Sequence, residues 1–331
     1  MAVEKTDGET VTLVPEHVII ATGSRPRHLP GLKADGKHVL TTDDALEMEQ
    51  LPRSMLIVGG GMIGVEWASL LNDFGVEVTV VESAERLLPQ EDEDISRELE
   101  RIFKKRKINV LTNARLLPES LRNAEGQLSL KILHHDQESD LSVEKVLVAV
   151  GRQANIEGIG LENTDIRVAD GFIQTNEYMQ TTEPHIYAVG DVAGGYMLAH
   201  AAAHEGMKAA EHIAGKEVLP AVQHAVPRCV YTRTEVAAVG LTEKEAREKG
   251  HEVKIGRIPF KAIGKSLVYG ETDGFVKVIA DRASNDILGV HMIGPHVTDY
   301  ISEAALARVL DATPWEVGQT IHPHPTLSEI I

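Results

Sequence analysis

The last residues of the chain, His322 to Ile331 (HPHPTLSEII), gather groups that can exchange protons. Histidine side chains as a class exchange protons near neutral pH, and Glu329 follows His324 a few residues later. Prolines on both sides of His324 stiffen the backbone. The cluster alone is compatible with an acid–base site, but also with a stiff terminal tail that carries exposed histidines, and His322 has either a supporting role or none.

A second group of residues has the spacing of a dinucleotide site. Gly59, Gly61 and Gly64 form G-x-G-x-x-G, in which the glycines permit a tight turn, close approach of a pyrophosphate, and close packing of helix on strand. Glu82 stands at the end of the next expected strand, where a carboxylate binds both ribose hydroxyls and repels a 2'-phosphate. The pattern predicts NAD rather than NADP, and only the nearby Arg86 argues against that preference. A glycine turn needed for packing alone would leave the position of Glu82 unexplained.

The elements that must position these residues predict an α/β fold. Residues 54–82 read as strand, glycine turn, helix and strand, a complete βαβ unit. Residues 91–107 follow as an amphipathic helix with an acidic first turn and a basic last turn. Further strands are expected at 17–26, 144–152 and 185–191, a helix capped by Gly215 at 199–215, a hairpin at 275–294, and a helix from Val297 that Pro314 ends.

Composition bounds the class of protein. With 331 residues, 43% hydrophobic and 25% charged, the chain is long enough for two or three domains. A net charge of -17 argues against nucleic acid and anionic membranes as partners. Neither an apolar run that could cross a bilayer nor a signal peptide is recognised, which predicts a cytoplasmic protein. The single cysteine, Cys229, excludes an internal disulfide and a CxxC-type metal site within one chain.

Further motifs occur in a fixed order: ATGS, the glycine-rich unit, AVGR, AVGD with MLAH after it, and the terminal HPTLSE. Singly, each could be a strand end with a turn. In this order they resemble the flavin-dependent pyridine nucleotide-disulfide reductases over essentially the whole chain. MLAH and HPTLSE are most similar to the members of that family that oxidise dihydrolipoyl groups. Glutathione-type reductases, mercuric reductase and soluble transhydrogenase are the alternatives within the family.

The resemblance implies a Rossmann-like NAD-binding domain inserted in a partial FAD-binding domain and followed by an α+β dimerisation domain. The expected boundaries are 1–45 for the first FAD segment, 46–170 for the NAD domain, 171–219 for the second FAD segment and 220–331 for the dimerisation domain. The implied assembly is a homodimer. Its implied partner is the lipoyl-bearing acyltransferase of a 2-oxo acid dehydrogenase complex.

The resemblance also assigns residues to roles. His324 is expected to be the acid–base residue and Glu329 its orienting partner, acting on a disulfide of the other subunit. This chemistry suits lipoyl groups, because a thiol must lose its proton before it attacks a disulfide. The expected NAD contacts are Gly59, Gly61, Met62, Ile63, Gly64, Glu66, Glu82 and Gly151, and the expected FAD contacts are Thr22, Gly23, Ser24, Asp191, Met197, Leu198, Ala199 and His200.

Two parts of the family pattern are not found in this sequence: a first G-x-G-x-x-G for FAD and the redox cysteine pair that follows it. Cys229 is expected to be an ordinary buried side chain and not a substitute. The chain is therefore expected to be an N-terminally truncated form of a longer enzyme, inactive toward dihydrolipoyl groups as given and with FAD retention open. The alternative is a non-catalytic module for NAD binding and dimerisation.

Overall fold

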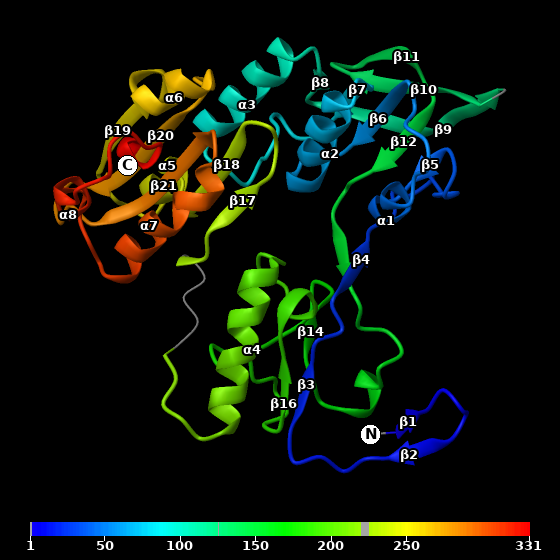
Figure 1. The fold of residues 1–331 in the computed structure, drawn as a ribbon. Coiled ribbons are helices and arrows are strands. Elements are labelled where there is room, and N and C mark those ends of the chain that lie inside the picture. Colours follow the sequence, from blue (N-terminus) through cyan, green and yellow to red (C-terminus); the bar gives the residue numbers. More distant parts are fainter. Residues whose placement is uncertain (1, 125, 220–224) are drawn as a thin grey trace. The chain divides into compact units, whose positions relative to one another are not determined.

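The chain forms two compact units that it visits in turn, as Figure 1 shows. The structure is a computed structural model that describes residues 2–124, 126–219 and 225–331. Of these, 2–25 and 152–219 form the first unit, and 26–151 and 225–331 form the second. The chain thus enters the first unit twice, as the predicted plan of one domain inserted in another requires.

The division between the units falls at different residues from the predicted domain boundaries. Residues 26–45 lie in the second unit because they contribute β5 (Val39–Leu40), which pairs in parallel with β12 (Lys145–Val148). Residues 152–170 lie in the first unit, where β13 (Arg152–Ala154) pairs with β4 (Ser24–Pro26). The boundaries expected at 45/46 and 170/171 therefore do not coincide with this division.

A five-stranded parallel sheet organises residues 26–151, in the order β5-β12-β6-β7-β8. Parallel strands are covered on both faces, which explains their almost continuous apolar runs. The predicted βαβ unit is present as β6, α2 and β7, and the predicted 91–107 helix is present as α3. Its elements are β6 (Ser54–Val58), α2 (Met62–Asp73), β7 (Glu77–Val81), α3 (Glu93–Lys105) and β8 (Asn109–Leu111), and a short α1 (Thr42–Leu46) precedes them.

Helix α3 illustrates why these segments fold as they do. Asp92 is its N-cap and accepts a hydrogen bond from the Asp94 N–H at 3.0 Å. Acidic residues occupy the first turn and lysines the last, as the helix dipole favours. Ile95, Leu99 and Ile102 are buried on one face, as the sequence predicts.

A three-stranded antiparallel sheet that the sequence analysis missed lies between β8 and β12. It consists of β9 (Ala114–Ala124), β10 (Gln127–His134) and β11 (Gln137–Val143). One face buries Leu128, Leu130 and Ile132 of β10, while the residues between them are exposed. The alternation is regular, but it is set among many polar residues and is easily taken for a connecting segment.

A five-stranded antiparallel sheet forms the core of residues 225–331, in the order β17-β18-β21-β20-β19. The predicted hairpin is β20 paired with β21. The α+β architecture is therefore as predicted. Its strands are β17 (Arg228–Val230), β18 (Glu235–Gly240), β19 (Val253–Pro259), β20 (Phe275–Asp281) and β21 (Ile287–Gly294), and its helices are α5 (Glu243–Glu248), α6 (Gly264–Tyr269), α7 (Val297–Val309) and α8 (Pro314–Gln319).

The prediction that Pro314 ends the long helix is wrong. Helix α7 has Leu310 as its C-cap, and Asp311 turns the chain with a φ of 51°. Pro314 instead opens α8, where Thr313 and Glu316 form a capping box. A proline suits the first helical position because no N–H is needed there.

The first unit carries smaller elements. Its central parallel pair is β3 (Val18–Ile20) with β16 (Ile186–Ala188), and α4 (Ala199–Ile213) follows, with Gly215 at a φ of 69° after its end. Its remaining strands are β1 (Ala2–Glu4), β2 (Thr10–Thr12), β14 (Val168–Ala169) and β15 (Phe172–Ile173). In the described part of the chain, no helix is both long enough and apolar enough to span a membrane.

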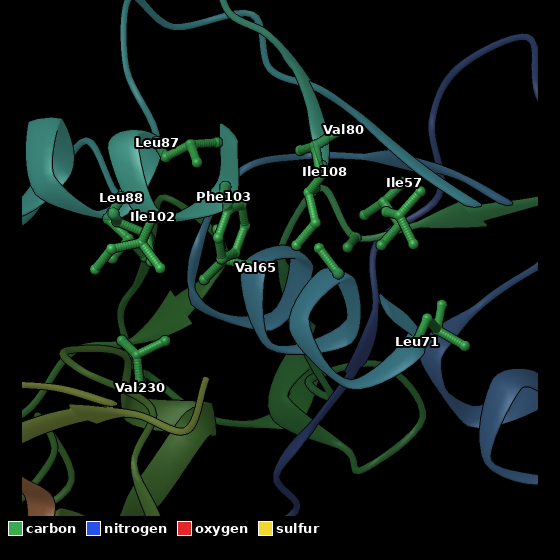
Figure 2. Close-up of a cluster of buried hydrophobic side chains, with 14 of the residues drawn as sticks. Ile57, Val65, Leu71, Val80, Leu87, Leu88, Ile102, Phe103, Ile108 and Val230 are labelled. Carbon is green, nitrogen blue, oxygen red and sulfur yellow. The ribbon is translucent and has the colours of Figure 1, made fainter. Parts of the chain in front are cut away.

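One hydrophobic core runs through the second unit across the two sheets. Leu87, Leu88, Ile102 and Phe103 belong to one buried cluster with residues of the parallel sheet, and Val230 of β17 belongs to the same cluster (Figure 2). Other members from the antiparallel sheet are Val236, Phe275 and Ile293. The two sheets of this unit therefore share buried apolar surface.

Candidate functional site

The glycine-rich turn between β6 and α2 needs its glycines for different reasons. A Cβ on Gly59, whose φ is 112°, would lie 2.3 Å from the Ala149 carbonyl oxygen. A Cβ on Gly64 would lie 1.9 Å from the Gly59 carbonyl oxygen, so helix and strand could not approach as they do. Gly61, the N-cap of α2, faces open space and makes no side-chain cap. The turn thus leaves the helix N-terminus accessible to an anion.

Gly64→Ala is therefore expected to lower the free energy of unfolding by about 1–3 kcal/mol, because the new methyl group overlaps a backbone oxygen. Gly61→Ala is the control, since its methyl group meets no atom within 4 Å. Urea unfolding of both variants measures the difference. Equal stability of the two would show that the tight approach is not required for the fold.

Glu82 lies just after β7 and is 9% exposed. Its Oε2 accepts a hydrogen bond from the Gly60 N–H at 2.6 Å, and its Oε1 accepts one from the Ala84 N–H at 2.7 Å. The carboxylate is thus fixed against the glycine-rich turn. Sequence reasoning placed it beside the turn, but did not anticipate that it bonds the turn directly.

Arg86 is bound to acidic partners of its own. Its guanidinium pairs with Glu85 at 3.1 Å and with Glu93 at 3.6 Å, and it donates to the Pro89 carbonyl at 2.9 Å. Arg86, the one cation that argued for NADP, is thus already paired with carboxylates of the protein.

The other residues predicted for NAD differ in their surroundings. Met62 and Ile63 are partly buried against the core. Glu66 accepts a hydrogen bond from the Tyr231 N–H at 2.8 Å, and burial raises the pKa of its carboxyl group. Gly151 has a φ of 108°, and its carbonyl accepts from the Arg27 N–H at 3.0 Å. Glu66 therefore faces the backbone after β17, a contact that the sequence did not suggest.

In the first unit, the residues predicted for FAD form a polar cluster. Ser24 Oγ donates to Asp191 Oδ2, and Arg152 Nε donates to Ser24 Oγ at 2.6 Å. Arg152 also pairs with Asp191 at 3.7 Å. Thr22 Oγ1 donates to the Asn155 carbonyl at 2.7 Å, and Asn155 N–H donates to the carbonyl of Gly23 at 2.9 Å. Arg152 and Asn155 were not singled out, although AVGR stands in the sequence.

The segment Met197 to His200 begins helix α4. Met197 has a φ of 51°, and Leu198 is an N-cap without a side-chain hydrogen bond. Ala199 and His200 are exposed in the first turn. The helix N-terminus is thus presented at the surface of this unit.

The terminal cluster has a defined geometry. His324 Nδ1 lies 2.8 Å from Glu329 Oε1, while Glu329 Oε2 accepts from the Thr326 N–H at 2.9 Å. The bond with His324 and then the Thr326 N–H lower the pKa of Glu329, so the carboxylate stays ionised at neutral pH. The His324 side chain is 76% exposed. His322 is different: its Nε2 lies 2.7 Å from Glu303 Oε1 on α7, and its side chain is 15% exposed.

Cys229 lies in β17 and is half-buried. Burial raises the pKa of its thiol to about 11, so the group is a thiol at neutral pH. This matches the expectation of a packing residue and not a nucleophile.

Comparison with known proteins shows the family of the chain. Residues 1–206 match the family described as pyridine nucleotide-disulphide oxidoreductase, and residues 226–331 match its dimerisation domain. The chain is 61% identical over 332 residues to the dihydrolipoyl dehydrogenase of Bacillus subtilis, which covers 100% of this chain and 70% of that protein. It is 43% identical over 339 residues to that of Zymomonas mobilis, covering 99% of this chain and 71% of the other.

Solved structures give the same result for the fold. The crystal structure of LpdA from Mycobacterium tuberculosis superposes with a TM-score of 0.92 at 29% identity, over 99% of this chain and 71% of that one. The HOCl-induced flavoprotein disulfide reductase RclA from Escherichia coli gives a TM-score of 0.88 at 26% identity, over 99% and 74%. These matches confirm the predicted fold class. The chain belongs to the pyridine nucleotide-disulphide oxidoreductase family, on the branch of the dihydrolipoyl dehydrogenases.

Proposed function

We propose that this chain contributes the NAD site, part of the FAD site and the acid–base residue of an enzyme that oxidises protein-bound dihydrolipoyl groups with NAD. The observation that carries the proposal is the exposed His324–Glu329 pair, at 2.8 Å, in a chain whose relatives are named dihydrolipoyl dehydrogenase. Neither a packing role nor a disordered tail needs an imidazole that is held through Nδ1 while its side chain stays 76% exposed.

His324 would accept and release one proton, with Glu329 holding its ring in place. Nδ1 of His324 is held by the carboxylate, which leaves Nε2 to accept the proton of a dihydrolipoyl thiol as that thiol attacks a disulfide. The ionised Glu329 then stabilises the imidazolium. Cys229 is the one cysteine of this sequence, so the disulfide that is attacked is not within it.

The residues around the glycine-rich turn fit NAD. Gly61 leaves room for a pyrophosphate at the N-terminus of α2, and the fixed carboxylate of Glu82 can accept hydrogen bonds from a ribose. Gly59 and Gly64 give the turn its shape, and we place Met62, Ile63, Glu66 and Gly151 along the same cofactor.

The cluster in the first unit fits the polar part of FAD. Ser24 and Asp191 offer hydroxyl and carboxylate groups, Thr22 and Gly23 the adjoining backbone, and Met197 to His200 the exposed start of α4. When bound, FAD would carry electrons from the cysteine pair, once the dihydrolipoyl group has reduced its disulfide, to NAD, which would accept them as hydride. The chain's own contribution is to hold both cofactors.

We further propose that the enzyme is a homodimer with a shared active site, which the dimerisation-domain match over residues 226–331 supports. The acyltransferase of a 2-oxo acid dehydrogenase complex would present the lipoyl group. The exposure of His324 suits a role toward a group that belongs to another subunit.

NADH is expected to bind more tightly than NADPH, because the Glu82 carboxylate repels a 2'-phosphate. Glu82→Gln should narrow this preference while still accepting from the Gly60 N–H. Glu82→Ala should also narrow it, and in addition weaken NADH binding, because the turn loses its support. Fluorescence titration with NADH and NADPH measures both effects. Wild-type binding of NADPH as tight as that of NADH would contradict the proposed cofactor.

A further inference from the structure

The glycine-rich turn is supported by the loop that joins β7 to α3, residues 83–92. Leu88 N–H donates to the Gly60 carbonyl at 2.8 Å. The Leu87 side chain packs so closely on Gly60 that a Cβ there would lie 2.6 Å from it. Gly60 also donates a hydrogen bond to Glu82. The position of this loop therefore affects the position of the turn and of the Glu82 carboxylate, which we place at the NAD ribose.

The far end of the loop is held by the dimerisation domain. Arg228 of β17 binds the Glu91 carboxylate with two hydrogen bonds, at 2.8 and 3.0 Å. Lys277 of β20 binds Asp92 at 2.8 Å. The side chains of Arg228 and Glu91 are 7% and 3% exposed, and those of Lys277 and Asp92 are 2% and 3% exposed. Charges buried so deeply persist only when they are paired with good geometry.

The surrounding groups satisfy these charges further. Lys277 also binds Asp94 at 2.7 Å and Glu243 at 2.9 Å, and the Glu243 N–H donates to Asp92 Oδ2 at 3.1 Å. The buried His291 donates from Nε2 to the Leu241 carbonyl at 2.9 Å. Leu88 and Val230 belong to the same apolar cluster in Figure 2. The loop is thus fixed from the dimerisation domain by polar and apolar contacts together.

We propose that Arg228 and Lys277 are positioning residues for NAD: they hold the 83–92 loop and, through Leu87, Leu88 and Gly60, set the geometry of the glycine-rich turn and Glu82. The inference rests on the proposed NAD site. It means that the dimerisation domain takes part in cofactor binding and specificity without touching the cofactor.

The test is NADH and NADPH titration of the full chain, with Glu91→Gln/Arg228→Met as the main variant. The double substitution removes both hydrogen bonds without leaving an unpaired buried charge. NADH affinity is expected to fall about tenfold, the change that about 1.4 kcal/mol of lost binding free energy produces. The preference for NADH over NADPH should narrow as well, because Glu82 is no longer held in place.

Two further variants separate positioning from stability. Asp273→Asn removes the pairs with Arg101 and Lys105, both at 2.7 Å, which also join α3 to the dimerisation domain but do not contact the loop. It should leave NADH affinity and preference unchanged. Arg228→Lys keeps one charged donor for Glu91, so it should retain more of the NADH affinity than the Glu91→Gln/Arg228→Met variant does. All titrations are made where near-ultraviolet circular dichroism shows each variant to be folded.

The outcomes are distinct. If the wild-type chain does not bind NADH, the proposed NAD site is wrong. If the wild type binds and the Glu91→Gln/Arg228→Met variant keeps its affinity and preference, the positioning inference is wrong. Equal losses in Asp273→Asn would also overturn it, since any contact between α3 and the dimerisation domain would then serve.

Discussion

Replacing His324 with alanine is expected to slow oxidation of dihydrolipoamide by roughly a hundredfold or more, the usual effect of losing a positioned general base. The expectation follows from the geometry: Nδ1 is occupied by Glu329 at 2.8 Å, and the side chain is 76% exposed, so Nε2 can reach a thiol. In the absence of that base, a larger share of the attacking thiol keeps its proton.

The assay needs a redox disulfide, so it is made on this chain extended with the segments of the Bacillus subtilis relative that lie outside the match, where the proposal expects the cysteine pair. His296→Ala is the control, because that histidine is exposed and pairs only weakly with Asp299, at 3.7 Å. Turnover should depend on His324 and not on His296. Unimpaired turnover of His324→Ala would show that the terminal cluster is not the acid–base site.

Replacing Lys277 with methionine is expected to lower the free energy of unfolding by about 3–5 kcal/mol, the usual cost of breaking a buried ion pair. Lys277 is bound by Asp92, Asp94 and Glu243, all within 2.9 Å, and is 2% exposed. Its loss leaves the buried Asp92 without its counter-charge, whereas Asp94 and Glu243 keep their pairs with Arg97 and Arg247. Lys131→Met is the matched control: its pair with Glu138 is exposed, and such pairs contribute about 0–1 kcal/mol. Urea unfolding at pH 7 gives both values.

The ion pairs of Lys277 also predict how the loss of unfolding free energy in Lys277→Met changes with pH. For Asp92, burial is the largest single effect and favours a raised pKa, but the bond from Lys277 and the weaker lowering effects, such as the bond from the Glu243 N–H, together exceed it and lower the pKa overall. For Glu243, the bond from Lys277 is the largest effect, and it lowers the pKa of that carboxyl group. The contribution of these two ionised carboxylates to the free energy of unfolding is therefore fully present above their pKa values in the unfolded chain, about 4. It is lost as the pH falls through their lower pKa values in the folded chain. The deficit of Lys277→Met should shrink below about pH 4. A deficit that does not change down to pH 3 would show that these carboxylates do not carry the effect.

The sequence predicted those parts of the fold that depend on nearby residues. The unit β6-α2-β7 could be predicted because its apolar runs, its glycines and its helix all lie within one short segment. Pro314 was misread because a proline can end one helix or open the next, and the capping box at Thr313 decides for the second. The β9–β11 sheet was missed because its regular alternation lies among many polar residues, which resemble a connecting segment.

In the candidate site, too, the contacts between residues close in the sequence were predicted, and the contacts between distant residues were not. The approach of His324 to Glu329 and of Glu82 to the glycine-rich turn involves residues whose spacing already suggested it. The bonds from Arg228 to Glu91 and from Lys277 to Asp92 join residues far apart along the chain, and no local pattern marks a buried charge. The contact of Glu66 with the Tyr231 backbone was likewise out of reach, since any residue could supply that N–H.

The common core of the second unit bears on how such proteins can exchange parts in evolution. The family descriptions divide between residues 206 and 226, yet Val230, Val236, Phe275 and Ile293 are buried against the interior of the parallel sheet. A dimerisation segment transplanted from a distant relative would bring foreign side chains to that shared interior and to the partners of Glu91 and Asp92. We therefore expect an exchange at this junction to preserve the fold only when the residues on both sides of the shared core are exchanged together.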